Sequence, residues 1–194
     1  MEYNISGVIL AGGENKRFGG RSKTDIIIEG KPIIDHLVET LGDLFDELLI
    51  VSNDPGKYIE FKNFKVVSDI FLKAGPLGGL HSSICASTKQ AVFLFAGDMP
   101  FIDKTLINSQ IKKYYEKKCD ALVPVVNNFP EPLHSIYNNN ILYKLEKYLS
   151  ESVDLSVHYF LSEIDTIYLE MPQTEDIIRS FTNINSPSDL TDIK

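Results

Sequence analysis

The sequence predicts an α/β protein in which helices cover both faces of a mostly parallel central sheet, giving three α/β/α layers. Short apolar runs recur along the chain without the alternation of a half-exposed strand, which is typical of strands covered on both faces. Segments with a helical spacing of apolar residues separate these runs. Strands joined in this way form parallel sheets with right-handed crossovers, and such sheets bind ligands beyond the carboxyl ends of their strands.

The apolar runs give the predicted strands, which cover residues 5–10, 48–51, 64–67, 91–95 and 121–126. Apolar positions with a period near 3.6 predict helices that start at Pro32 and that cover residues 106–115 and 141–149. The glycine-rich segment 75–79 opens a further predicted helix that extends through Cys85. Polar residues follow three of the strands, and we expect them at one edge of the sheet: Asn53, Asp69 and Asp98.

Length and composition restrict the class of function. The 194 residues fit one domain, residues 1–194. The chain has 27 acidic and 19 basic residues and a net charge of -8, which disfavours nucleic acid and anionic membranes and favours a small-molecule substrate. Cys85 and Cys119 form no Cys-x-x-Cys pair, so neither a disulfide framework nor a zinc site is expected. No stretch resembles a signal peptide or a membrane span, and we expect a cytoplasmic protein.

A glycine-rich loop directly after the first predicted strand is the first candidate site. The segment Leu10 to Gly13 is followed by the cations Arg17 and Lys23. Glycines let main-chain N–H groups surround phosphate oxygens, and Arg and Lys add positive charge. The loop matches neither G-x-x-x-x-G-K-[ST] nor G-x-G-x-x-G, which disfavours a P-loop or a dinucleotide site. On these residues alone, phosphate binding and an ordinary surface turn are both open.

Two carboxylates strengthen the case for phosphate chemistry. Asp98 follows a buried strand within Gly97 to Pro100, where a magnesium ion would meet triphosphate oxygens. Asp69 ends its strand in the same way. Either residue would alternatively cap a helix or turn, since a helix is predicted to start near Asp103. The small residues of segment 75–79 would let a flat base lie against the backbone, or would serve only a tight turn.

At these residues the chain resembles the molybdenum cofactor guanylyltransferases, which are Rossmann-like nucleotidyltransferases with the fold of the nucleotide-diphospho-sugar transferases. Residues 10–23 are similar to the signature L-A-G-G-x-x-x-R-[FM]-G-x-x-K. The resemblance continues over nearly the whole chain, through Gly30 to Pro32, Asn53, segment 75–79 and Gly97 to Pro100. The last part, residues 181–190, is similar to the closing segment N-x-N-[ST]-P-x-[DE]-L.

The resemblance implies the roles of individual residues. Residues implied to contact GTP are Leu10, Ala11, Gly12, Gly13, Lys23, Asn53, Asp69, Pro76, Leu77 and Asp98. Asp98 and Asn185 are implied to bind Mg²⁺, and Arg17, Lys23 and Asp98 are implied to act in catalysis. The implied reaction joins GMP from GTP to a terminal phosphate of molybdopterin and releases pyrophosphate, without a covalent enzyme intermediate. Transient contact with the apoenzymes that accept the cofactor is a further implication.

Three departures from the family pattern and two alternative functions accompany this interpretation. Ser22 precedes Lys23 where an acidic residue is frequent, Gly78 stands where Ala is common, and His134 replaces an aromatic or apolar residue. The alternatives are another nucleotidyltransferase of the superfamily, acting on a sugar phosphate or using CTP, and a non-catalytic nucleotide-binding domain. The first is disfavoured because cytidylyl relatives usually carry A-A-G where this chain has Ala11 to Gly13.

Overall fold

The computed structural model describes residues 3–12, 22–185 and 189. The strands are β1 (Ile5–Leu10), β2 (Ile27–Ile28), β3 (Lys31–Pro32), β4 (Leu48–Val51), β5 (Lys65–Val67), β6 (Ala91–Ala96), β7 (Ala121–Val126), β8 (Phe129–Pro130), β9 (His134–Asn138) and β10 (Thr166–Glu170). The α-helices are α1 (Ile33–Gly42), α2 (Pro76–Ala86), α3 (Lys104–Lys117), α4 (Leu142–Glu151), α5 (Val157–Ser162) and α6 (Glu175–Ser180). Short 3₁₀ turns are η2 (Lys23–Asp25), η3 (Pro55–Tyr58) and η4 (Asn139–Ile141).

The main sheet has the strand order β10-β7-β9-β6-β1-β4-β5, with β8 paired to β7, and β2 and β3 form a separate hairpin. Neighbours are parallel at β1/β4, β1/β6, β4/β5 and β7/β10. β9 lies between β6 and β7 and runs antiparallel to both. The predicted class, a mostly parallel sheet within an α/β fold, is therefore confirmed, with two reversed strands, β8 and β9, that the sequence analysis did not predict.

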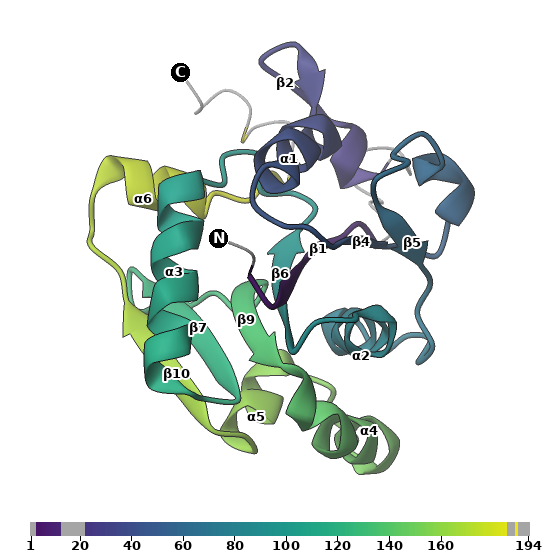
Figure 1. Cartoon of the computed structure of the whole chain (residues 1–194), viewed down its shortest axis with the longest axis vertical. Coiled ribbons are helices and arrows are strands. Elements are labelled where there is room, and N and C mark those ends of the chain that lie inside the picture. Colours follow the sequence, from purple (N-terminus) through teal and green to yellow (C-terminus); the bar gives the residue numbers. More distant parts are fainter. Residues whose placement is uncertain (1–2, 13–21, 186–188, 190–194) are drawn as a thin grey trace.

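Helices cover both faces of the sheet, and the side chains of single strands divide between two apolar clusters. In β1, Ile5 and Ile9 pack in the cluster that contains apolar residues of α1 and α3, whereas Val8 packs in the cluster of α2, α4 and α5. Figure 1 shows α1 and α3 on one side of the strands and α2, α4 and α5 on the other. This double coverage is the physical reason that β6 is a continuous apolar run and that β1 lacks the alternation of a half-exposed strand.

Most predicted elements lie where they were expected. The predicted strands 5–10, 48–51 and 121–126 coincide with β1, β4 and β7, and the helix expected from Pro32 begins at Ile33. The strands of the hairpin β2–β3 and of β8, β9 and β10, together with α5 and α6, were not predicted. Among the described helices the longest has 14 residues, and none has the length and apolar character of a membrane span.

Candidate active site

The register of the parallel strands brings four strand ends to one edge of the sheet. Leu10 at the end of β1 pairs with Val51 of β4 and with Ala96 of β6, and Val51 pairs in turn with Val67 of β5. Three main-chain hydrogen bonds continue this alignment past the strands, from Ala11 N to Val51 O, from Ser52 N to Val67 O and from Gly97 N to Leu10 O. The loops after β1, β4, β5 and β6 are thereby held side by side.

These loops enclose a cleft of about 1150 Å³. Predicted contact residues that line it are Leu10, Ala11, Gly12, Lys23, Asn53, Asp69, Pro76 and Asp98. Leu77 does not line the cleft: its side chain is fully buried in the apolar cluster beneath α2, so contact with a ligand would be restricted to its main chain. Gly13 and Arg17 lie outside the described residues.

Lys23 lies between two oxygens at the centre of the site. Its Nζ donates to Asp98 Oδ2 at 2.6 Å and to Asn185 Oδ1 at 2.5 Å. The Asp98 side chain is 14% exposed, so this ion pair is partly shielded from water. Asn185 reaches the site because Ile184 N donates to the carbonyl oxygen of Asp98 at 2.9 Å. Residues 23, 98 and 185, which are distant in sequence, therefore meet at one point.

The alternative in which Asp98 caps a helix does not apply to α3. Asp103 is the N-cap residue of that helix, and its Oδ1 accepts a hydrogen bond from Leu106 N at 2.7 Å. Asp98 precedes the cap and faces Lys23 instead. The carboxylate of Asp98 is thus free of a capping role at α3 and is directed into the cleft.

Asn53 and Asp69 hold each other across the ends of β4 and β5. Asn53 Nδ2 donates to Asp69 Oδ2 at 2.9 Å, and Asp69 N donates to Asn53 Oδ1 at 3.1 Å. The second carboxylate oxygen, Asp69 Oδ1, is buried and has no hydrogen-bond partner among the described residues. Asp69 does not cap α2, whose N-cap residue is Gly75. A buried acceptor without a partner at the wall of a cleft is suited to a ligand N–H or O–H.

Two glycines are required where the main chain approaches closely at this edge. A Cβ on Gly97 would lie 2.7 Å from Leu10 O and 2.9 Å from Thr24 Cγ2. A Cβ on Gly78 would lie 2.7 Å from Phe71 O, which explains why this chain has Gly at a position where Ala is common in the family that it resembles. Close contact between the loops after β1, β5 and β6 therefore depends on the absence of side chains.

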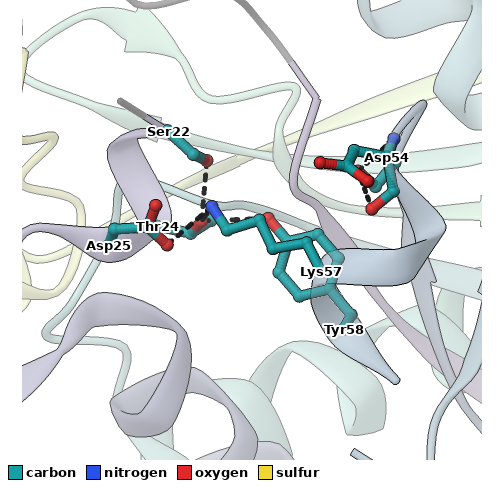
Figure 2. A network of polar contacts seen from close by, with 7 residues as sticks. Ser22, Thr24, Asp25, Asp54, Lys57 and Tyr58 are labelled. Carbon is teal, nitrogen blue, oxygen red and sulfur yellow. Dashed lines mark hydrogen bonds and ion pairs between the residues drawn. The ribbon is translucent and has the colours of Figure 1, made fainter. Parts of the chain in front are cut away.

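Four cleft residues that the sequence analysis did not single out form a polar network, which Figure 2 shows. They are Thr24, Asp25, Lys57 and Tyr58, from η2 and η3. Lys57 Nζ lies 2.6 Å from Asp25 Oδ1 and donates to Thr24 Oγ1 at 3.2 Å. The only sequence signals were that Thr24 adjoins Lys23 and that Lys57 follows Asn53 by four residues.

His134 lies in the core rather than at the cleft. Its ring is fully buried and its centroid is 5.5, 5.1 and 4.6 Å from those of Phe93, Phe95 and Phe181. Neither ring nitrogen finds a hydrogen-bond partner among the described residues, and burial lowers the pKa of His134 to about 3. Burial also raises the pKa of the neighbouring Glu131 carboxyl to about 7. His134 is therefore a neutral ring that replaces an aromatic side chain in the core.

Comparison with known proteins places these features in context. The sequence profile described as "MobA-like NTP transferase domain" matches residues 7–163. A probable molybdenum cofactor guanylyltransferase of Natranaerobius thermophilus is 38% identical over 98% of this chain and 95% of its own length. A molybdenum cofactor guanylyltransferase of Desulfosudis oleivorans is 30% identical over 96% and 92%. The crystal structure of molybdopterin-guanine dinucleotide biosynthesis protein A from Archaeoglobus fulgidus shares the fold, with a TM-score of 0.82, 23% identity and coverage of 96% and 95%.

Proposed function

The chain belongs to the MobA-like NTP transferase family, and on that premise we propose that it is a molybdenum cofactor guanylyltransferase, which transfers GMP from GTP to molybdopterin and releases pyrophosphate. The observation that carries the proposal is the meeting of Lys23, Asp98 and Asn185 at the carboxyl edge of the sheet, where Lys23 and Asp98 line a cleft large enough for a nucleotide. The curated relatives above support the choice of guanine and of molybdopterin.

The reaction needs alignment and charge neutralisation more than it needs a strong base. The attacking group is the terminal phosphate of molybdopterin, which is already anionic. Its oxygen forms a bond to the α-phosphorus of GTP while the bond from that phosphorus to the bridging oxygen of the β-phosphate breaks, and pyrophosphate leaves with the electron pair. In this proposal Lys23 neutralises charge that develops on the departing pyrophosphate, and Arg17 adds a second cation. Gly12 lines the same cleft as Lys23, and its exposed backbone is open to phosphate oxygens.

Recognition of the nucleoside is assigned to the other side of the cleft. The Asn53–Asp69 pair lines this side of the cleft, and its amide and carboxylate groups match the N–H and hydroxyl groups of a nucleoside. Gly75, Pro76 and Gly79 line the cleft without bulky polar side chains, so a flat base has room to lie against the backbone. In the proposal the base therefore lies near the start of α2 and the triphosphate near Lys23.

The residues beside Lys23 also fit a magnesium ion. The described part of the chain has no group of three or more His, Cys, Asp or Glu side chains placed to hold a metal. Asp98 Oδ2 and Asn185 Oδ1 nevertheless converge on one cation, the Lys23 ammonium, which marks where a positive charge is held. Mg²⁺ commonly takes one or two protein oxygens and completes its shell with water and substrate phosphates. When bound, it would act as a Lewis acid toward the α-phosphate.

The test is pyrophosphate release from GTP, ATP, CTP and UTP with Mg²⁺, with and without molybdenum-loaded molybdopterin. Release confined to GTP with molybdopterin supports the proposal. Asp98→Asn is expected to be nearly inactive, because it removes the charge that would hold the metal. Asp103→Asn is the matched control, since it makes the same change five residues away and Asn caps helices as well as Asp does.

Two outcomes would redirect the assignment. Turnover with CTP or with a sugar phosphate would move the chain to another branch of the nucleotidyltransferases. Equal activity of Asp98→Asn and Asp103→Asn would show that the metal is held elsewhere.

We also propose transient contact with acceptor apoenzymes, which the lability of the product favours. Absence of any complex with such apoenzymes after crosslinking would contradict that contact.

A further inference from the structure

We propose that the Thr24 hydroxyl, together with Tyr58, Lys57 and Asp25, is a positioning device that holds Lys23 against Asp98. These residues do not touch the reacting atoms in this proposal, and they act through the placement of η2. The catalytic consequence rests on the proposed function, whereas the placement of Lys23 in the ligand-free protein does not.

The Thr24 hydroxyl is the centre of the network. Its Oγ1 lies 2.7 Å from Ser22 Oγ and 3.0 Å from the Tyr58 hydroxyl, and it accepts from Lys57 Nζ at 3.2 Å. This hydroxyl therefore has three polar neighbours. One belongs to Ser22, directly before η2, and the other two belong to Tyr58 and Lys57 of η3. Figure 2 shows these side chains converging on Thr24 from the two short turns.

Burial distinguishes this network from an ordinary surface cluster. Thr24 is 2% exposed and Tyr58 is 1% exposed, so the hydrogen bond between them is shielded from water. Breaking a shielded hydrogen bond leaves a polar group without a partner, which is costly. On the opposite side, Thr24 Cγ2 lies 2.9 Å from the position that a Cβ on Gly97 would occupy. Thr24 is thus packed between η3 and the loop that carries Asp98.

Lys57 and Asp25 add a second tie between the same two turns. Lys57 Nζ lies 2.6 Å from Asp25 Oδ1, and the Lys57 side chain is 25% exposed. Because Lys57 also bonds Thr24, its ammonium joins consecutive residues of η2 to η3. Lys23 is the first residue of η2, directly before these two anchored residues.

The backbone of η2 has two other kinds of support. Within the turn, Asp25 N donates to Ser22 O and Ile26 N donates to Lys23 O at 3.2 Å, and Ile33 N donates to Ile26 O at 2.9 Å, which ties the residue after the turn to α1. That bond anchors the far end of the turn, so on the side that faces Asp98 the turn is held by the packing of Thr24 and by the ties to η3. Loss of the hydroxyl should let the turn shift and should let the Lys23 ammonium leave Asp98.

The experiment measures how fast Lys23 reacts in the nucleotide-free protein. Lysines are methylated with formaldehyde and a mild reductant, and peptide mapping by mass spectrometry gives the rate at Lys23. We expect a several-fold faster rate in Thr24→Val and a wild-type rate in Thr24→Ser, which keeps the hydroxyl. Thr166→Val is the matched control. Thr166 lies on β10, away from the cleft, and its Oγ1 donates a hydrogen bond to Leu161 O.

Each result decides the proposal. An unchanged rate in Thr24→Val, equal rates in Thr24→Val and Thr24→Ser, or an equal increase in Thr166→Val would overturn it. If Thr24→Val does not fold, Tyr58→Phe is compared with wild type by the same measurement, and an unchanged rate there would likewise overturn it.

Turnover supplies the second readout. We expect kcat of Thr24→Val to fall by about tenfold or more, with a smaller change in KM for GTP. In the proposed function the metal replaces the Lys23 ammonium at Asp98, and the placement of η2 then sets where Lys23 meets the departing pyrophosphate. Misplacement of a catalytic group by about 1 Å costs up to roughly 10²-fold. A purely structural role would lower the amount of folded enzyme without changing kcat per folded molecule. If the wild-type protein releases no pyrophosphate, the proposed function fails, and the methylation rates still decide whether Thr24 places Lys23.

Discussion

Replacement of His134 by Leu should remove a specific part of the dependence of stability on pH. The ring is fully buried among three phenylalanines, and its pKa is lowered from 6.5 to about 3 by burial. Between these two pH values the unfolded chain binds a proton that the folded protein does not bind. Folding stability must therefore rise with pH through this window, and it is lost as the pH falls.

The magnitude follows from the two pKa values. At pH 5 the unfolded imidazole is almost fully protonated and the folded one is almost fully neutral, whereas at pH 7 both are mainly neutral. The difference amounts to about 1.4 pK units, or about 2 kcal/mol of unfolding free energy, lost by the wild type between pH 7 and pH 5. His134→Leu keeps a similar side-chain volume without a titrating group, so the variant should not show this loss.

Urea unfolding of both proteins at pH 7 and pH 5 measures the effect. Every other titrating group is present in both proteins, so the difference between their pH dependences isolates His134. At pH 7 the variant should also be more stable, since two buried nitrogens that lack described partners are removed. If both proteins lost the same stability between pH 7 and pH 5, the ring would have to be solvated or hydrogen-bonded, and the argument would fail.

Three further predictions concern other parts of the structure. Glu131, whose pKa is raised to about 7, should make the folded protein lose stability as the pH rises from 4.5 to 7; Glu131→Gln should remove this loss in urea unfolding, on the order of 2 kcal/mol after allowance for contact with water. Gly78→Ala should lower stability by about 1–3 kcal/mol, seen as a lower thermal midpoint, because its Cβ would lie 2.7 Å from Phe71 O. Lys23→Met should bind Mn²⁺ more tightly without nucleotide, measured by electron paramagnetic resonance, because it frees Asp98 from a competing cation; weaker binding would contradict that competition.

The sequence predicted the elements whose two faces are both covered. β4 and β7 are continuous apolar runs, and β1 is apolar apart from Ser6 and Gly7, so their limits could be read directly from the residues. β9 could not be predicted in this way, because His134, Ser135 and Tyr137 are polar although they are buried. Local hydrogen bonds satisfy two of them: Ser135 Oγ donates to Glu131 O and Tyr137 OH donates to Pro132 O. Both bonds run back to the loop directly before β9, and the period of apolar residues along a strand does not reveal them.

The site shows the same division between local and long-range information. That Asn53, Asp69 and Asp98 lie at one edge of the sheet followed from their positions after predicted strands, and the register places them there. The contact of Asn185 with Lys23 was not available from spacing, since it depends on the docking of Ile184 on Asp98. The network of Thr24 and Tyr58 was missed because Thr and Tyr carry no distinctive pattern on short turns.

The docking of Ile184 on Asp98 has a consequence for how the protein is made. A ribosome releases the chain from its amino end, so β1, β4, β5 and β6 can pair while residues near 185 are still unsynthesised. During that interval Lys23 and Asp98 can already meet, but the amide oxygen of Asn185 is missing from the cluster. A nascent chain would hold an incomplete cluster until Ile184 docks on Asp98, so completion of this cluster is a late step in the synthesis of the protein.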